Sequence, residues 1–140
     1  MEIDSMLQTN YSTRYSYLIL SLLYPGRDWK DKTFHEDHIF PQTEFQRKKL
    51  KARGYDDEKI SKYLSCYNTI CNLELLDESE NKTKNAKPFD EWISERDDNF
   101  KQRHHIPIMN DYSFDNFLEF IELRKKTLID FFQKIQFDTF

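Results

Sequence analysis

The sequence predicts an α+β fold in which helices surround a small unit of two strands and one helix. Three observations support this class. Only 2 of the 140 residues are Gly and 4 are Pro, whereas 33% are charged and 16% aromatic, which favours helices over a β-sandwich. Apolar residues recur at helical spacing near both ends of the chain. Two short segments between them are rich in β-forming residues. The length corresponds to a single domain, which we assign to residues 1–140.

An apolar stripe with helical spacing predicts the first helix over residues 5–23, and we expect this stripe to be buried. It consists of Leu7, Tyr11, Tyr15, Leu18 and Leu22. Pro25 and Gly26 end the helix, because proline cannot continue one and glycine accepts the left-handed conformation that closes one. Residues 33–40 are too few for a helix and rich in β-formers, so they predict a strand.

Two polar helices are predicted over residues 44–53 and 56–67, separated by Gly54. We treat residues 44–67 as a helical insertion rather than as part of the core. The first of these helices contains five basic residues and one acidic residue, so it faces either DNA or solvent.

Residues 70–76 alternate loosely in polarity and predict the second strand. Asp77 or Ser79 can cap the helix that follows. The strand, strand and helix unit therefore occupies about residues 33–88, with the insertion inside it.

Two more helices are predicted after this unit, over residues 89–103 and 113–137. Ser113 caps the second, whose core-facing stripe has the 3.6-residue period. That stripe consists of Phe114, Phe117, Leu118, Ile121, Leu128, Phe132 and Ile135.

Composition excludes several classes of protein. No segment approaches the ~20 apolar residues of a membrane span, and the first ten residues lack signal-peptide features, so we expect a cytoplasmic protein without a membrane partner. Cys66 and Cys71 are too few for a disulfide framework and are predicted to be free thiols. The net charge of −4 argues against nucleic acid as a partner, although basic residues gather in 44–53 and 82–87.

Asp37 and His38 stand side by side near the end of the first predicted strand. Asn72 precedes the second strand's apolar run, and Asn81 follows nine positions later on the next helix. Carboxylate and amide oxygens suit Mg²⁺ or Mn²⁺, and a neutral imidazole with a pKa near ~6.5 accepts a proton from water. Hydrolysis of a phosphodiester needs such a cation and such a base.

These motifs resemble those of the HNH endonucleases, and more narrowly the DUF1524 nuclease domain that accompanies DUF262 in GmrSD-type restriction and phage-defence proteins. The likeness runs from about Tyr15 to Trp92, and more weakly through the final helix. Its residues are Asp37, His38, Ile39, Phe40, Pro41, Gln42, then Asn72, Leu73, Glu74, Leu75, Leu76, then Asn81, Lys82, Lys84, Asn85, Lys87, Pro88, Phe89 and Trp92.

The resemblance implies a ββα-metal centre around one divalent cation. By position, His38 is the general base, Asp37 is a metal ligand and Asn72 steadies the loop between the strands. Asn81 completes the metal site, where it replaces the histidine for which the family is named. With oxygen ligands only, Mg²⁺ or Mn²⁺ is favoured over Zn²⁺ or Ni²⁺.

Five neighbouring residues are candidates for contact with substrate or for support of the metal ligands. They are His35, Gln42, Lys82, Lys84 and Asn85. Strand alternation places His35 on the same side as Asp37, and Lys84 lies one turn from Asn81 on the same helix face. Ordinary packing or solvation is the alternative for each of them.

The sequence thus predicts a metal-dependent DNA endonuclease whose activity rises with pH as the imidazole loses its proton. A non-cleaving nucleic-acid-binding or interaction module with the same fold is the alternative, and a nuclease acting on RNA is a third. The resemblance also implies a nucleotide-hydrolysing DUF262 domain, for which 140 residues leave no room. We expect it on a separate subunit, or the chain to be a domain excised from a longer protein.

Overall fold

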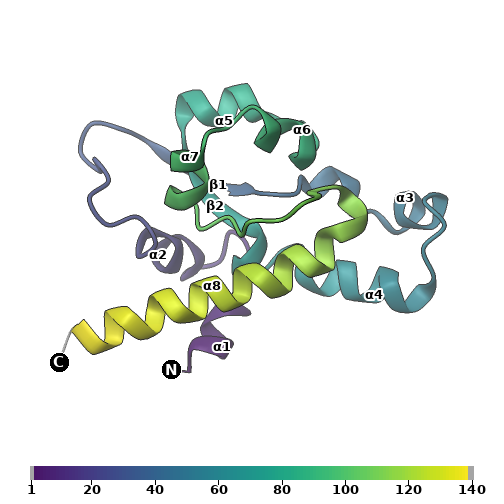
Figure 1. The fold of residues 1–140 in the computed structure, drawn as a ribbon, viewed down its shortest axis with the longest axis horizontal. Helices are drawn as coiled ribbons and strands as arrows, with labels where there is room; N and C mark the ends of the chain where they lie inside the picture. Colours follow the sequence, from purple (N-terminus) through teal and green to yellow (C-terminus); the bar gives the residue numbers. More distant parts are fainter. Residues whose placement is uncertain (1, 139–140) are drawn as a thin grey trace.

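Two antiparallel strands and the helix after them form the centre of the molecule (Figure 1). The computed structural model describes the backbone of residues 2–138 and the side chains of residues 2–135. Strand β1 (Phe34–His38) pairs with β2 (Leu73–Asp77), and α5 (Glu78–Lys84) contacts both strands. The register places Asp37 opposite Glu74. The predicted α+β class is confirmed.

Helix α5 begins where the sequence allows two capping residues, and Asp77 is the one used. The Asp77 side chain accepts a hydrogen bond from Glu80 N at 2.8 Å, and the Glu80 side chain accepts one from Asp77 N at 3.3 Å. This reciprocal pair satisfies two amide groups at the helix start. It also fixes the angle at which α5 leaves β2, and so places its last turn over β1.

The predicted single helix over residues 5–23 is wrong, because the structure has α1 (Ile3–Leu7) and α2 (Ser16–Ser21). Between them Asn10 forms an isolated β-bridge with Thr69, and Tyr11 N donates to Asn68 O at 2.8 Å. This backbone pairing with a distant segment replaces helical hydrogen bonds and breaks the helix.

The predicted buried stripe of that helix is confirmed at Leu7 but is wrong in its second half. Tyr15, Leu18 and Leu22 are 55%, 59% and 46% exposed, whereas Ile19 and Leu20 are buried. Because the helix restarts at residue 16, its phase is independent of Leu7, and a neighbouring set of apolar residues faces β2.

The two polar helices predicted as an insertion are present as α3 (Arg47–Ala52) and α4 (Asp57–Cys66), preceded by the short 3₁₀ helix η1 (Gln42–Glu44). They belong to the core, contrary to the prediction. Leu50, Ile60 and Tyr63 have no exposed surface, and α4 contacts the C-terminal helix. The polar composition describes their outer faces only.

The helix predicted over residues 89–103 is divided into α6 (Phe89–Ser94) and α7 (Asp98–Arg103). Asp97 starts α7 by accepting a hydrogen bond from Phe100 N at 2.8 Å. The last predicted helix is η3 (Phe114–Asn116) followed by α8 (Phe117–Asp138), and Ser113 precedes it without a side-chain cap.

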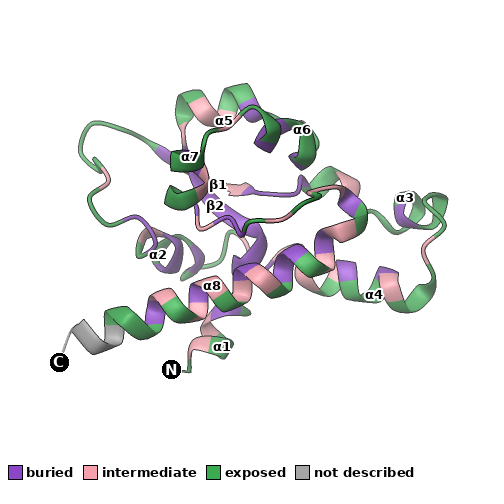
Figure 2. Ribbon diagram, in the orientation of Figure 1, coloured by how far each residue is buried: buried purple, intermediate pink, exposed green. Residues whose placement is uncertain are grey.

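Figure 2 shows buried residues recurring along α8, and one of its buried residues, Arg124, ties this helix to the sheet. Arg124 has no exposed surface and donates hydrogen bonds to three carbonyls around η2 (Ile70–Asn72) and the start of β2. The distances are 3.1 Å to Ile70 O, 3.0 Å to Cys71 O and 2.7 Å to Leu73 O, with a fourth of 3.0 Å to His104 O. This arginine therefore holds α8, β2 and the end of α7 together.

Two expectations about environment can be compared with the structure. Between residues 2 and 138, none of the helices is both long and apolar enough to cross a membrane. Cys66 and Cys71 are free thiols, the second of them buried.

Candidate active site

His38 ends β1 and lies in a pocket of aromatic and amide side chains. It is only 7% exposed. Its ring centroid is 4.4 Å from that of Tyr11 and 6.1 Å from that of Tyr67. Its Nε2 lies 2.8 Å from the side-chain oxygen of Asn68. Tyr11 reaches this position because the break between α1 and α2 brings its backbone against Asn68.

The contact with Asn68 selects one tautomer of His38. An amide oxygen only accepts hydrogen bonds, so Nε2 carries the proton and Nδ1 keeps its lone pair. Burial lowers the pKa of His38, an effect that the Asn68 hydrogen bond and the Asp37 charge oppose. The imidazole is therefore neutral near pH 7, which is the state that a general base requires.

Asp37 points to the opposite face of β1, toward α5. Its Oδ2 lies 3.0 Å from Nζ of Lys84, which also donates a hydrogen bond of 2.9 Å to His38 O. The Lys84 side chain has no exposed surface and that of Asp37 is 12% exposed. Lys84 therefore supports Asp37 from inside, and the burial of its ammonium contradicts a direct contact with substrate phosphate.

A second carboxyl, Glu74, faces Asp37 across the strand pair. It is 1% exposed, and its burial, followed by the nearby Asp37 charge, raises its pKa well above the ordinary value. The raised pKa favours the neutral form of Glu74, whereas Asp37 forms the ion pair with Lys84.

The buried polar cluster continues behind Glu74 to His104 and Tyr24. His104 Nδ1 lies 3.4 Å from Glu74 Oε1 and 2.8 Å from the Tyr24 hydroxyl. Sequence reasoning missed these residues and also Asn68. The only sign of this cluster in the sequence was one carboxylate within an apolar strand. The contacts themselves join segments that are far apart in the chain.

Asn72 joins the segment after β1 to the segment before β2. The side chain is fully buried, and its Oδ1 accepts a hydrogen bond of 2.9 Å from Phe40 N. Its Nδ2 donates to Phe40 O at 3.1 Å and to Tyr67 O at 2.8 Å. The Asn72 carbonyl accepts a further bond of 2.8 Å from Ile39 N. These bonds fix the backbone immediately after His38.

Asn81 and Asn85 lie one turn apart at the end of α5. Asn81 is half-buried, and the described residues offer its side-chain amide no hydrogen-bond partner. It is one turn before Lys84, on the same face of the helix. Asn85 is exposed and ends the helix at φ +48°.

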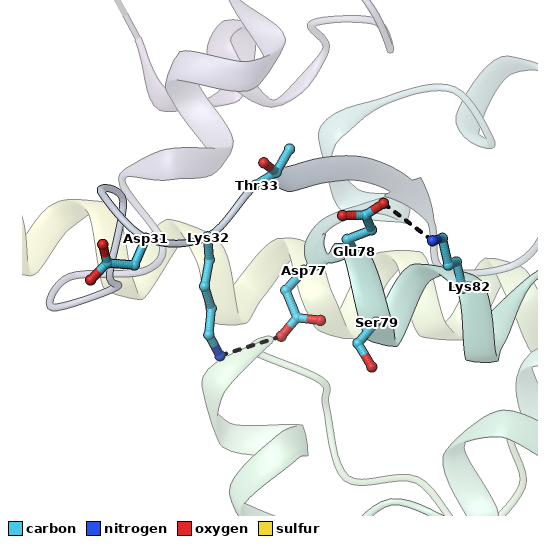
Figure 3. Close-up of a pocket in the computed structure, with 7 residues that line it drawn as sticks. All are labelled: Asp31, Lys32, Thr33, Asp77, Glu78, Ser79 and Lys82. Carbon is cyan, nitrogen blue, oxygen red and sulfur yellow. Dashed lines mark ion pairs between the residues drawn. The ribbon is translucent and has the colours of Figure 1, made fainter.

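The remaining candidates are on the surface. His35 and Gln42 are exposed. Lys82 is exposed and lies 3.2 Å from Glu78 Oε1. It lines an open cavity of about 530 Å³ at the start of α5, at the other end of the sheet from His38 (Figure 3). Lys32 and Asp77 form a second ion pair there, with 3.7 Å between Nζ and Oδ2.

The oxygen atoms near Asp37 can be compared with the ligands that a divalent cation requires. Within the described part of the chain, no three His, Cys, Asp or Glu side chains converge as a metal site does. Lys84 occupies Oδ2 of Asp37, which leaves Oδ1 of Asp37 and the Asn81 amide. Mg²⁺ usually keeps several waters and takes one or two carboxylates together with substrate phosphates. The oxygens present fit this partly hydrated mode.

A comparison with protein families gives one match, to a family described as GmrSD restriction endonucleases, C-terminal domain, over residues 3–130. No curated protein matches the chain. The matched range contains both strands, α5 and all of the candidate site residues, and the family name denotes nucleases that cleave in restriction. This chain therefore belongs to the family of the C-terminal domain of GmrSD restriction endonucleases.

Proposed function

We propose that this chain is a metal-dependent HNH-type DNA endonuclease acting in restriction or phage defence. The observation that carries the proposal is His38, a neutral imidazole whose Nε2 is bonded to Asn68 and whose Nδ1 is left as proton acceptor. It lies next to Asp37, the carboxylate of the central pair that forms an ion pair with Lys84. The general base and the candidate metal ligand thus extend from opposite faces of β1.

In the proposed reaction, His38 accepts the proton of the attacking water. Asp37 and Asn81 would hold one divalent cation, Mg²⁺ or Mn²⁺, which when bound supplies positive charge for the phosphate and the departing oxygen. Lys84 orients Asp37 through their ion pair. Asn72 holds the backbone that follows His38, so the base keeps its position while DNA binds.

We further propose α3 as a contact to the DNA backbone. Arg47, Lys48, Lys49 and Lys51 are all exposed on this short helix, and none of them has an ion pair within the described residues. Such a cluster attracts phosphates although the net charge of the chain is −4. A DUF262-type domain, supplied by the same or another chain, and a cytoplasmic location complete the proposal.

A non-cleaving nucleic-acid-binding module is the alternative, and the Asp37–Lys84 ion pair favours it. A lysine already neutralises the carboxylate that a cation would use. In that case DNA would bind equally well with and without metal.

Plasmid nicking with Mg²⁺, with Mn²⁺ and with a chelator tests the two candidates. We expect cleavage only with added metal, and its loss in His38→Ala but not in Lys30→Ala, an exposed residue on the loop before β1. RNA digested in parallel tests the substrate. Equal DNA binding without any cleavage, by a folded protein under all three conditions, would establish the alternative.

A further inference from the structure

A second cavity, of about 350 Å³, lies away from His38, between the loop after α2 and the end of α7. Its volume is within the range of about 300–1,000 Å³ found for small-molecule sites. Arg27 and Arg103 line it together with the Gln102 amide, Phe131 adds aromatic surface, and the buried Tyr24 ring supports Arg27. Of the residues that line this cavity, only Tyr24 also belongs to the buried polar cluster behind Glu74.

The charge of this cavity is unusual for an acidic protein. No Asp or Glu lines it, and neither arginine forms an ion pair with any described residue. The larger cavity of Figure 3 differs in this respect, because it contains three carboxylates and both of its lysines are paired. Two unpaired guanidinium groups in one cavity favour an anionic ligand.

The arginine side of the cavity is also held in place before any ligand arrives. The Arg27 guanidinium lies 4.8 Å from the ring centroids of both Tyr24 and Phe34. His105 Nε2 donates to Leu23 O at 2.9 Å, which joins the two walls of the cavity. His105 adopts φ +55°, a conformation that is rare for residues other than glycine.

The positive charge around this cavity also affects the pKa of a neighbouring histidine. The pKa of the buried His104 lies well below its usual value, chiefly through burial and then through the charges of Arg27, Arg103 and Arg124. Arg124 is fully buried and donates hydrogen bonds only to backbone carbonyls, and its charge also acts on His104.

We propose that this cavity binds a phosphate ester, whose phosphate contacts Arg27 and Arg103 and whose attached ring lies against Phe131. Guanidinium groups bind phosphate oxygens in pairs, and aromatic rings accept a nucleobase by stacking. The phosphate belongs to a free nucleotide or to a nucleic-acid strand, and the two are distinguished by titrating each separately.

The test is calorimetric titration of the full chain in a metal chelator, so that no cleavage occurs. One arm uses thymidine 5′-monophosphate and the other a short single-stranded oligodeoxynucleotide. The variant Arg27→Gln/Arg103→Gln is compared with Lys30→Gln/Lys126→Gln, two exposed lysines outside the cavity whose loss changes the charge equally. Gln102→Glu, compared with the exposed Gln133→Glu, repels an anion without removing an arginine that packs on the fold.

We expect saturable binding of at least one ligand by the wild type. Affinity should fall at least about tenfold in the double arginine variant and in Gln102→Glu, and less than about twofold in both controls. Binding of the mononucleotide assigns the site to a free nucleotide, and binding of the oligonucleotide alone assigns it to a strand. Failure of both ligands to bind, or equal loss in the controls, would overturn the proposal. Neither result depends on whether His38 supports cleavage.

Discussion

The side-chain oxygen of Asn68 lies 2.8 Å from Nε2 of His38, a contact between residues 30 positions apart in the chain. It fixes both the orientation and the tautomer of the imidazole. Asn68 touches no reacting atom in the proposed reaction, so it is a positioning residue for the base.

Asn68→Ala should reduce the nicking rate by about 10–100-fold, by analogy with the loss of the hydrogen-bond partner of a metal-bound histidine. Asn68→Asp retains the acceptor and should recover much of the rate. The ¹⁵N shifts of His38 report the tautomer, which should change only in the alanine variant. The exposed Asn99→Ala is the matched control. Normal nicking by Asn68→Ala would show that Asn68 has no positioning role.

Lys84→Met should destabilise the protein by about 3–5 kcal/mol, because it leaves the carboxylate of Asp37 largely buried without its counter-charge. Urea unfolding measures the change. Lys82→Met, on the exposed side of the same helix, should change the free energy of unfolding by less than about 0.5 kcal/mol.

A second variant separates lost charge from lost packing at Lys84. Asp37→Asn/Lys84→Met removes both charges, and it should be more stable than Lys84→Met alone. If the double variant were the less stable of the two, the ion pair would not be the source of the destabilisation.

Asn72→Ala should cost at least about 3 kcal/mol, because it leaves two groups of Phe40 and one of Tyr67 without their buried partner, at about 1–3 kcal/mol each. Chemical denaturation followed by circular dichroism measures the loss. A change below about 1 kcal/mol would indicate that water or a shifted backbone replaces these bonds.

Acidification should destabilise the protein through three histidines. Burial lowers the pKa of His38, His104 and His105, so the unfolded chain binds protons that the folded chain excludes. Their contribution is complete above about pH 6.5 and declines below it, by up to about 1.4 kcal/mol per pH unit for each proton. Urea midpoints measured from about pH 7.5 to 5.5 test this slope.

Glu74 has the opposite effect on the pH dependence of stability. Its pKa is raised in the folded state, so its contribution is present below the ordinary carboxyl pKa and is lost as pH rises. Glu74→Gln removes this opposing slope, and the loss of stability on acidification should become steeper. An unchanged slope in this variant would show that Glu74 is ionised in the native protein.

Local signals explain what was predicted correctly. The strand, strand and helix order follows from short β-rich segments, from a capping residue and from the amphipathic pattern of α8, all of which act within one or two turns of chain. The breaks after Leu7 and Ser94 could not be predicted in this way. The first depends on the bridge between Asn10 and Thr69, and the second places α7 against the buried cluster around His104.

The sequence by itself predicted the local elements that carry Asp37, His38, Asn72 and Asn81, because β-rich segments and a helix cap are encoded within short stretches of chain. The tertiary structure decided what surrounds them. Lys84 reaches His38 O across 46 residues and Arg124 reaches Leu73 O across 51, so only folding shows that the first is a buried counter-ion rather than a surface lysine. Burial raises the pKa of Glu74 and lowers that of His38, and burial is a property of the packed core rather than of any segment.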